Sequence, residues 1–375
     1  MRYELSVPAR INILGNPSDA LEGDHSTISA AIDLRAGARI QDSDAIIVEG
    51  LERKAGGELA VAVAQEYRQA PPLPYDGTLD LVKAAINRLY AYSPELRQKW
   101  TRFRPHLSTW TDVPRCGLAG SSLFVLLTLA GLRALYNLDP YQHNDYILCE
   151  ITQRVEELEL GITCGFADRY VPLFGGLAYM DYRGKLLHKA IGEEPYVTYE
   201  KLDDWVKELP LVIAHTGVSR DSGNVHSVLR RRYLQEYERL QAGAIRTSVM
   251  VRIMEQVGST AWRGKVALLQ NDLPQFGRLM SENHRLVNEM MEYCGFTEGA
   301  GWANNLLIEA AMANGALGAK LTGAGGGGSV FALTSPGDEE RVSAGIQRAA
   351  ADKGLTGATV FRARLSRAGL IIQQP

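Results

Sequence analysis

The sequence lacks the marks of several protein classes. Its most apolar stretch is interrupted by Thr128, Gly131 and Arg133 before it reaches bilayer length, and the chain does not open with a charged segment followed by an apolar core. It has no basic excess either, because 40 Lys and Arg stand against 43 Asp and Glu, a net charge of −3. A general nucleic-acid binder would carry a surplus of positive charge. We therefore expect a cytoplasmic protein without a membrane or nucleic-acid partner.

Cysteine is scarce and lacks motif spacing. The four cysteines (Cys116, Cys149, Cys164 and Cys294) form no CxxC or CxxH pair, which favours reduced thiols over a disulfide framework or a zinc site. The sequence also has no GxxxxGK[ST] motif, which excludes a P-loop enzyme, and no internal repeat. Glycine, in contrast, is abundant at 37 residues, and its clustering predicts tight backbone turns.

The length of 375 residues exceeds one ordinary core, so we expect two domains or one large α/β domain. The polar segment from Gly192 to Trp205 has the composition of a connector, which places a division near residue 190, between domains 1–190 and 191–375. Hydrophobic patterns predict strands over 1–14, 28–34, 37–40, 45–48, 100–110 and 209–214. They predict helices over 79–90, 123–135, 146–160, 225–257, 260–270, 272–293 and 302–314.

A glycine-rich turn precedes the most apolar predicted helix. Residues 117–120 read GLAG, and Ser121 and Ser122 follow as favoured N-cap residues for the helix from Leu123 to Leu135. The start of a helix exposes unpaired N–H groups and the positive end of its dipole, and glycines let an anion approach the backbone closely. The turn is therefore a candidate phosphate cradle. The alternative is an ordinary capped core helix.

A second glycine cluster lies near the end of the chain, in KLTGAGGGGSVFAL from Lys320 to Leu333. Five of the six residues from Gly323 to Gly328 are glycine, and a strand-like segment follows directly, which argues against a merely flexible loop. The segment formally matches GxGxxG. It follows a helix and precedes a strand, however, which is the reverse of a dinucleotide-binding turn.

Charged residues in three other segments are further candidates. Arg10 lies in the first predicted strand and Asp19 in the turn after it; both could face one cleft, or serve as a surface ion pair and an Asx-turn residue. The helix over 146–160 carries four carboxylates whose directions the periodicity leaves open: Glu150, Glu156, Glu157 and Glu159. Gly161 ends this helix, and Gly165 and Asp168 follow in the segment ITCGFAD.

Three segments, VPARINILG, PRCGLAGSS and KLTGAGGGG, together resemble the three motifs of the GHMP kinase superfamily in order and spacing over essentially the whole chain. The segments GNPSD, ELGITCGFADRYVPLFGGLAYMDY and DSGNVHSVLRRRY are most similar to the glucuronokinase branch, and the turn at 216–223 also resembles bacterial heptose-phosphate kinases. The resemblance implies an α/β (α+β) fold of two domains, with the active site in the cleft between them.

The same resemblance implies a role for each matching residue. Asp168 matches the catalytic aspartate, as a general base or an electrostatic orienter, and Arg10 matches its basic partner. Ser122 and Glu156 match the Mg²⁺ ligands. The expected ATP and phosphate-binding residues are Gly117, Leu118, Ala119, Gly120, Ser121, Ser122, Gly323, Ala324 and Gly325. The expected substrate-binding residues are Asp19, Gly165, Arg220 and His226, although Arg220 and His226 could equally be a surface turn and a helix start.

The implied activity is ATP- and Mg²⁺-dependent phosphorylation of a sugar hydroxyl, most like the anomeric oxygen of D-glucuronate, by a monomer or homodimer. Three departures from the motifs stand out: the turn before Ser121 is shifted by one residue, Leu123 replaces a small residue, and Glu22 and Asp24 bring negative charge to the loop after Asp19. Such charge would disfavour a carboxylate acceptor. The alternatives are a neutral sugar, a heptose phosphate or mevalonate as acceptor, or a non-catalytic binding protein on this fold.

Overall fold

The computed structural model describes residues 1–375 apart from 22–24, 55, 114–117, 119, 184, 186–190, 192, 194–195, 207, 219–221 and 375. The predictions for Glu22, Asp24, Gly117, Ala119 and Arg220 therefore lie outside the described residues. Within them, no helix is long and apolar enough to cross a bilayer.

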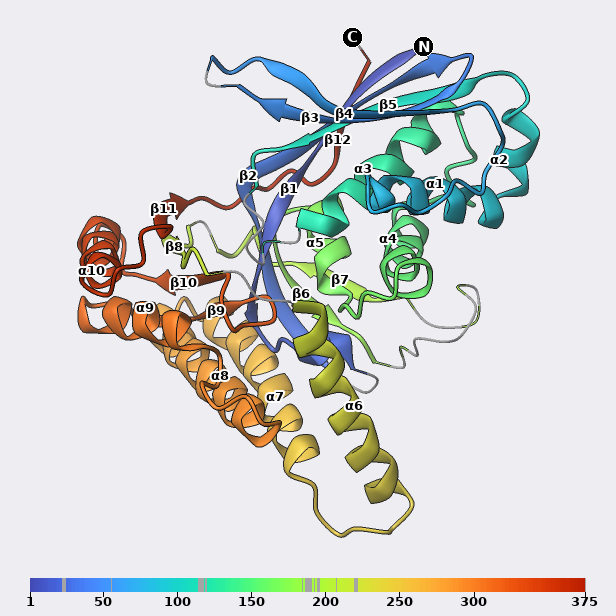
Figure 1. The fold of residues 1–375 in the computed structure, drawn as a ribbon. Helices are drawn as coiled ribbons and strands as arrows, with labels where there is room; N and C mark the ends of the chain where they lie inside the picture. The colour runs from blue at the N-terminus through green and yellow to red at the C-terminus, as the bar shows by residue number, and fades with distance from the viewer. Residues whose placement is uncertain are drawn as a thin grey trace.

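The larger of two sheets contains the first and the last strand, and its strands follow the order β12-β1-β2-β5-β3-β4, with β6 joining β2 to β7. Neighbouring strands are antiparallel except β3 and β5. The strands are β1 (Arg2–Leu14), β2 (Ser26–Ser43), β3 (Ile46–Arg53), β4 (Leu59–Tyr67), β5 (Arg104–Thr111), β6 (Leu177–Asp181), β7 (Thr198–Lys201) and β12 (Ile371–Gln373). The long strands β1 and β2 pair from Arg2↔Gln41 to Leu14↔Ile28 and run through the centre of the molecule (Figure 1).

Helices cover this sheet along one side, on the right in Figure 1. They are α1 (Asp80–Tyr92), α2 (Pro94–Lys99), α3 (Gly120–Leu135), α4 (Asp145–Arg154) with a π-helical extension (Val155–Glu159), and α5 (Ala167–Phe174). The apolar run predicted as a buried helix is α3, whose leucines and valine belong to the main core. That prediction is confirmed.

The smaller sheet is antiparallel, with strand order β11-β8-β10-β9. It consists of β8 (Leu211–His215), β9 (Gly318–Thr322), β10 (Ser329–Leu333) and β11 (Thr359–Ala363). Helices α9 (Trp302–Ala313) and α10 (Glu339–Asp352) pack on it around a separate core, while α6 (Ser222–Gln241), α7 (Val249–Leu269) and α8 (Leu273–Tyr293) form the lower part of the molecule (Figure 1). The predicted combination of α and β elements is thus confirmed.

Several predicted element boundaries are wrong. The helix over 225–257 is two helices, because Ser248 starts α7 by accepting a hydrogen bond from the Val251 amide at 3.0 Å, and α7 then runs without a break past the expected gap at 257–260. The strands over 28–34 and 37–40 are one long strand, and the strand over 100–110 begins only at Arg104. The polar connector contains β7, which pairs with β6 and so extends the larger sheet past the division expected near residue 190. That division stays a prediction.

Helix α8 and strand β9 touch backbone to backbone at two glycines. A Cβ atom on Gly277 would overlap the Leu317 carbonyl, and one on Gly318 would overlap the Gly277 carbonyl. This close approach brings Asn283 of α8 and Lys320 of β9 up to the end of β1, where both make buried hydrogen bonds.

Replacing Gly277 with alanine should therefore destabilise the protein, although alanine is normally the better helix residue. We expect the free energy of unfolding to fall by about 1–3 kcal/mol, as for other overpacked sites. Gly258 in α7 is the matched control, because its added Cβ would come no closer than 3.7 Å to His25. Gly258→Ala should be neutral or gain up to ~1 kcal/mol from helix propensity. Denaturant unfolding of both variants measures this, and equal stabilities would contradict the tight α8–β9 contact.

Candidate functional site

A cavity of about 460 Å³ lies where β1, the start of α3, α5, the start of α6 and the glycine run after β9 meet. Its volume is in the range of small-molecule sites. The predicted site residues that line it are Arg10, Asp19, Gly120, Ser121, Ser122, Glu156, Gly165, Asp168, His226, Gly323, Ala324 and Gly325. Leu118 is fully buried next to this cavity, where its carbonyl accepts a hydrogen bond from the Arg10 amide at 3.4 Å.

An ion pair between Arg10 and Asp168 lines this cavity, which is called the cleft below. Arg10 is buried, and its Nε donates to Asp168 Oδ1 at 2.6 Å while Nη2 contacts the same oxygen. Asn12 points from the same face of β1, two residues on, and its Nδ2 donates to this oxygen at 3.4 Å. Burial alone would raise the pKa of Asp168, but the charges of Arg10 and Arg169 outweigh it and lower the pKa. The pair is therefore ionised at neutral pH, and the alternative of a surface ion pair for Arg10 is wrong.

Asp19 lies in a single 3₁₀ turn (Ser18–Ala20) next to this pair. Its Oδ2 accepts a hydrogen bond from the Ala167 amide at 3.0 Å, and its carbonyl accepts from the Phe166 amide at 3.2 Å, so its contacts lie on the segment that starts α5. Any side chain at Gly165 would overlap the Asp19 carboxylate, which explains the glycine there. Burial and, next, the negative charge of Asp168 raise the pKa of Asp19 to about 6.

The structure separates the four carboxylates that the sequence left open. Glu156 lines the cleft and is buried; Glu150 is fully buried away from the cleft, among a tyrosine, a lysine and an arginine that donate to it. Glu157 and Glu159 pair with arginines of α6 and α1. The helix changes from α to π at Val155, which alters the direction of each following side chain. A constant helical period could not have predicted this arrangement.

Ser122 and Glu156 form a pair of oxygen ligands. Ser122, in the first turn of α3, donates from Oγ to Glu156 Oε2 at 2.7 Å. Two ligands at right angles on one Mg²⁺ lie about 3 Å apart, given metal–oxygen distances of about 2.1 Å. The spacing and chemistry of this pair therefore fit Mg²⁺ with water and phosphate oxygens as its other ligands. In the described part of the chain, no group of three or more His, Cys, Asp and Glu side chains could hold a metal on its own.

The glycine run after β9 is ordered by specific contacts. Gly323 and Gly325–Gly328 all have positive φ, between 79° and 145°, a region that favours glycine. The Gly326 amide donates to Ala300, the Gly328 amide donates to Val218 at 3.0 Å, and Asn304 donates to the Gly327 carbonyl at 3.1 Å. The expectation of an ordered turn over a flexible loop is confirmed.

Sequence reasoning missed two buried polar residues, on β9 and α8, that bind the end of β1 next to the site. Lys320 of β9 is fully buried, and its amine donates to Asn12 O at 3.1 Å, Asn16 Oδ1 at 2.8 Å and Leu321 O at 3.0 Å. Burial, with help from Arg10, lowers its pKa to about 7. Asn283 of α8 accepts from the Gly15 amide at 2.9 Å. A lysine inside a strand of otherwise apolar and small residues was the one available signal for this support.

Sequence reasoning also missed two further residues, one that lines the cavity and one that is buried behind its lining residues. Thr322 of β9 accepts hydrogen bonds through Oγ1 from Arg10 Nη1 at 3.5 Å and from the Asn12 amide at 3.4 Å, which connects the two sheets. Arg169 follows Asp168 directly, is completely buried, and donates to Glu156 Oε2 and to the Gly165 carbonyl. His226 was predicted, and it lines the cleft as part of α6; burial lowers its pKa below the usual 6.5 although Asp168 acts in the opposite direction.

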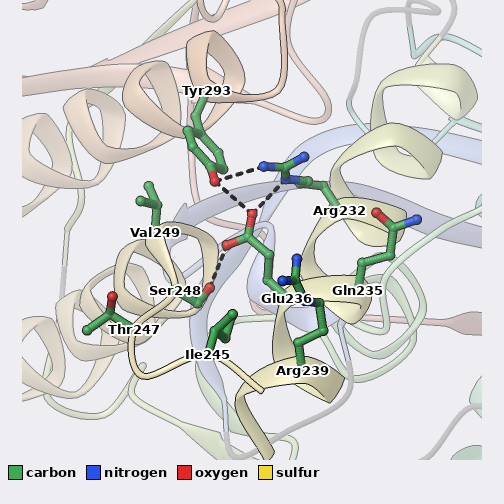
Figure 2. Close-up of a pocket in the computed structure, with 9 residues that line it drawn as sticks. All are labelled: Arg232, Gln235, Glu236, Arg239, Ile245, Thr247, Ser248, Val249 and Tyr293. Atoms are coloured by element: carbon green, nitrogen blue, oxygen red, sulfur yellow. Dashed lines mark hydrogen bonds and ion pairs between the residues drawn. The ribbon is translucent and has the colours of Figure 1, made fainter. Parts of the chain in front are cut away.

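A second cavity, of about 220 Å³ and remote from the first, lies between α6, α7 and α8 (Figure 2). Its central side chain, Glu236, accepts hydrogen bonds from Arg232 at 2.6 Å, Ser248 at 2.7 Å and Tyr293 at 2.8 Å. Burial opposes ionisation, but these three donors lower the pKa of Glu236. The carboxylate thus joins three helices, which is a structural role.

Comparison with known proteins agrees with the geometry. Residues 80–176 match the family model "GHMP kinases N terminal domain", and residues 265–352 match "GHMP kinases C terminal". The chain is 31% identical over 336 residues to a probable glucuronokinase 2 of Arabidopsis thaliana (88% of this chain, 84% of that protein). It is 27% identical over 380 residues to a mevalonate kinase of Pyrococcus abyssi (98% and 97%).

Solved structures show the same fold. The galactokinase of Lactococcus lactis complexed with galactose superposes with a TM-score of 0.76 at 18% identity, covering 99% of this chain and 95% of that chain. The predicted two-domain architecture is thereby confirmed. With its family-model matches in both halves and its 31% identity to a plant relative, the chain belongs to the GHMP kinase family, a family of ATP-dependent kinases of small molecules.

Proposed function

We propose that this kinase transfers the γ-phosphoryl group of ATP to a sugar hydroxyl, with the anomeric oxygen of D-glucuronate as acceptor. The observation that carries the proposal is the buried Arg10–Asp168 pair, which faces the same cavity as the helix start at Ser122 and the glycine run. The identity to plant glucuronokinases, 29% and 31%, supports the acceptor. The match to mevalonate kinases along nearly the whole chain makes mevalonate the second candidate.

In this proposal Asp168 receives the proton of the acceptor hydroxyl. Within the described residues, the hydrogen bonds to its side chain from Arg10 and Asn12 all fall on Oδ1. The other oxygen, Oδ2, is then the one to contact the substrate. The lowered pKa keeps the carboxylate ionised, and Arg10 stabilises negative charge on the transferring group. The pair therefore fits a base as well as an electrostatic orienter.

The phosphates would lie against the start of α3. Gly120, Ser121 and Ser122 offer backbone N–H groups and the positive end of the helix dipole, and Gly323, Ala324 and Gly325 line the same cavity. Mg²⁺, when bound, would neutralise charge on the β- and γ-phosphates. Ser122 and Glu156 would hold it by their side-chain oxygens.

The acceptor would be bound by other residues of the cavity. Asp19 would accept hydrogen bonds from those acceptor hydroxyls that do not react, and Gly165 would leave the space that the Asp19 carboxylate needs. His226 would contact the acceptor from α6.

ADP release from Mg·ATP tests the function directly, with glucuronate, galacturonate, galactose, arabinose, a heptose phosphate and mevalonate as acceptors. We expect turnover with glucuronate to exceed that with every other compound. Turnover on a neutral sugar, a heptose phosphate or mevalonate instead would retain the kinase and overturn the uronate acceptor. Bound ATP without turnover on any acceptor would contradict the proposed reaction.

Asp168→Asn should bind ATP normally and lose most turnover. Removing the ionised carboxylate takes away the proton acceptor, a contribution of about 10²–10⁴ in rate. Isothermal titration with ATP and a coupled ADP assay separate binding from turnover. Asp44→Asn, on an exposed turn between β2 and β3, is the control and should match the parent protein. Full activity in Asp168→Asn would refute the assignment.

The pKa of Asp19 predicts opposite pH trends in stability and in acceptor use. Its folded-state pKa of about 6 exceeds the ordinary 3.8, so the stability that the protonated carboxyl contributes is fully present below pH 3.8 and is lost as the pH rises through 6. Acceptor binding needs the ionised form, because a carboxylate accepts stronger hydrogen bonds. The kcat/KM for the acceptor should therefore rise through pH 6 while the thermal midpoint of the ligand-free protein falls.

Asp19→Asn, which does not titrate, is the matched comparison. Its kcat/KM should be about 10–100-fold lower, from the loss of a charged hydrogen bond, and should show no inflection near pH 6. A parent-like inflection in this variant would assign the titration to another group, with His226, which lines the same cavity, as the candidate.

A further inference from the structure

Arg169 has an unusual position for a charged residue. It is completely buried on α5, directly after Asp168, and its guanidinium contacts two residues that line the cavity, Glu156 and Gly165. Nη2 donates to Glu156 Oε2, the same oxygen that accepts from Ser122 Oγ. Nη1 donates to the Gly165 carbonyl, and Nε has no hydrogen-bond partner within the described residues. Within the described residues, both partners of its hydrogen bonds are therefore residues of the site.

Glu156 has a buried counter-charge of its own. Arg169 pairs with Glu156, and Arg10 pairs with Asp168, so each of these two carboxylates is offset by one guanidinium. Asp19, the third carboxylate of the cavity, accepts its hydrogen bond from the Ala167 amide instead. Solvent screens buried charges only weakly, so each of them contributes to the energy of a cation that approaches Glu156. A divalent cation at Glu156 would approach a carboxylate oxygen that already carries the Arg169 guanidinium, so the attraction from Glu156 would be largely offset.

We propose that Arg169 is a positioning residue that holds the Glu156 carboxylate in place and offsets its charge, so that a divalent cation enters this site only together with nucleotide phosphates. This inference rests on the proposed kinase function. The phosphates of the nucleotide supply the negative charge that attracts the cation. The hydrogen bond from Arg169 holds the Glu156 carboxylate in position before the nucleotide binds. A residue that only held the turn at Gly165 would have no effect on cation binding.

Binding of Mn²⁺ to the nucleotide-free protein, followed by electron paramagnetic resonance, tests this. Removal of the positive charge in Arg169→Gln should leave the Ser122–Glu156 pair with net negative charge and tighten Mn²⁺ binding at least about tenfold over the parent protein. Arg169→Lys retains the charge and should bind free Mn²⁺ as weakly as the parent. The double variant Glu156→Gln/Arg169→Gln should lose the gain, because the anionic ligand is then absent.

Thermal unfolding gives an independent measurement if Arg169→Gln folds poorly. Free Mn²⁺ should raise the midpoint of Arg169→Gln and leave the parent unchanged, whereas Mn²⁺ with ADP should raise both. Equal Mn²⁺ binding in the parent and Arg169→Gln, or a gain that persists without Glu156, would overturn the proposal. Neither measurement needs an acceptor or turnover, so a failure here leaves the kinase proposal intact, and a failed acceptor panel leaves this one intact.

Discussion

The buried ion pair between Arg10 and Asp168 is the interaction on which the rest of the site depends. A charge removed from water is strongly destabilising unless an opposite charge and hydrogen bonds compensate it. Arg10 comes from β1 and Asp168 from the first turn of α5, so the pair fixes the helix against the sheet. Asn12 and Thr322 add hydrogen bonds from two more positions, one of them on the smaller sheet. A change in any of these elements alters the environment of the same carboxylate.

Support for this pair comes from segments that are far apart in the sequence. Two buried side chains hold the end of β1 in place. Lys320 donates to the Asn12 carbonyl and the Asn16 side chain, and Asn283 accepts from the Gly15 amide. These contacts exist because α8 and β9 approach at two glycines, closer than side chains would allow. The backbone contact between α8 and β9 thus sets the positions of Asn283 and Lys320 at the end of β1. The turn that carries Asp19 follows directly, so its carboxylate is placed by the same support.

The parts of the site that could be predicted from the sequence are those with a local signal. Glycine clusters, the serine at a helix start and the apolar period of α3 mark their own positions, because the physical requirement acts within a few residues. Arg169 carries no such signal, and Lys320 carries only that of a lysine inside an apolar strand, which does not identify its partners on other elements. The direction of Glu156 depends on a π-helical turn that interrupts the helical period. The edge strand β7 was missed because its exposed sequence, TYEK, is mostly polar.

The charges in the cleft also limit where an acidic acceptor could lie. Asp19 and Asp168 would repel a carboxylate, and among the described residues that line the cavity the basic groups are Arg10, whose guanidinium binds Asp168, and His226. Burial lowers the pKa of His226, so its imidazole is neutral at physiological pH and acts as a hydrogen-bonding group. A uronate would therefore bind with its hydroxyls toward the two aspartates and its carboxylate toward α6. The hydroxyl contacts would then be common to neutral and acidic sugars, and discrimination between them would arise at the α6 side of the cleft.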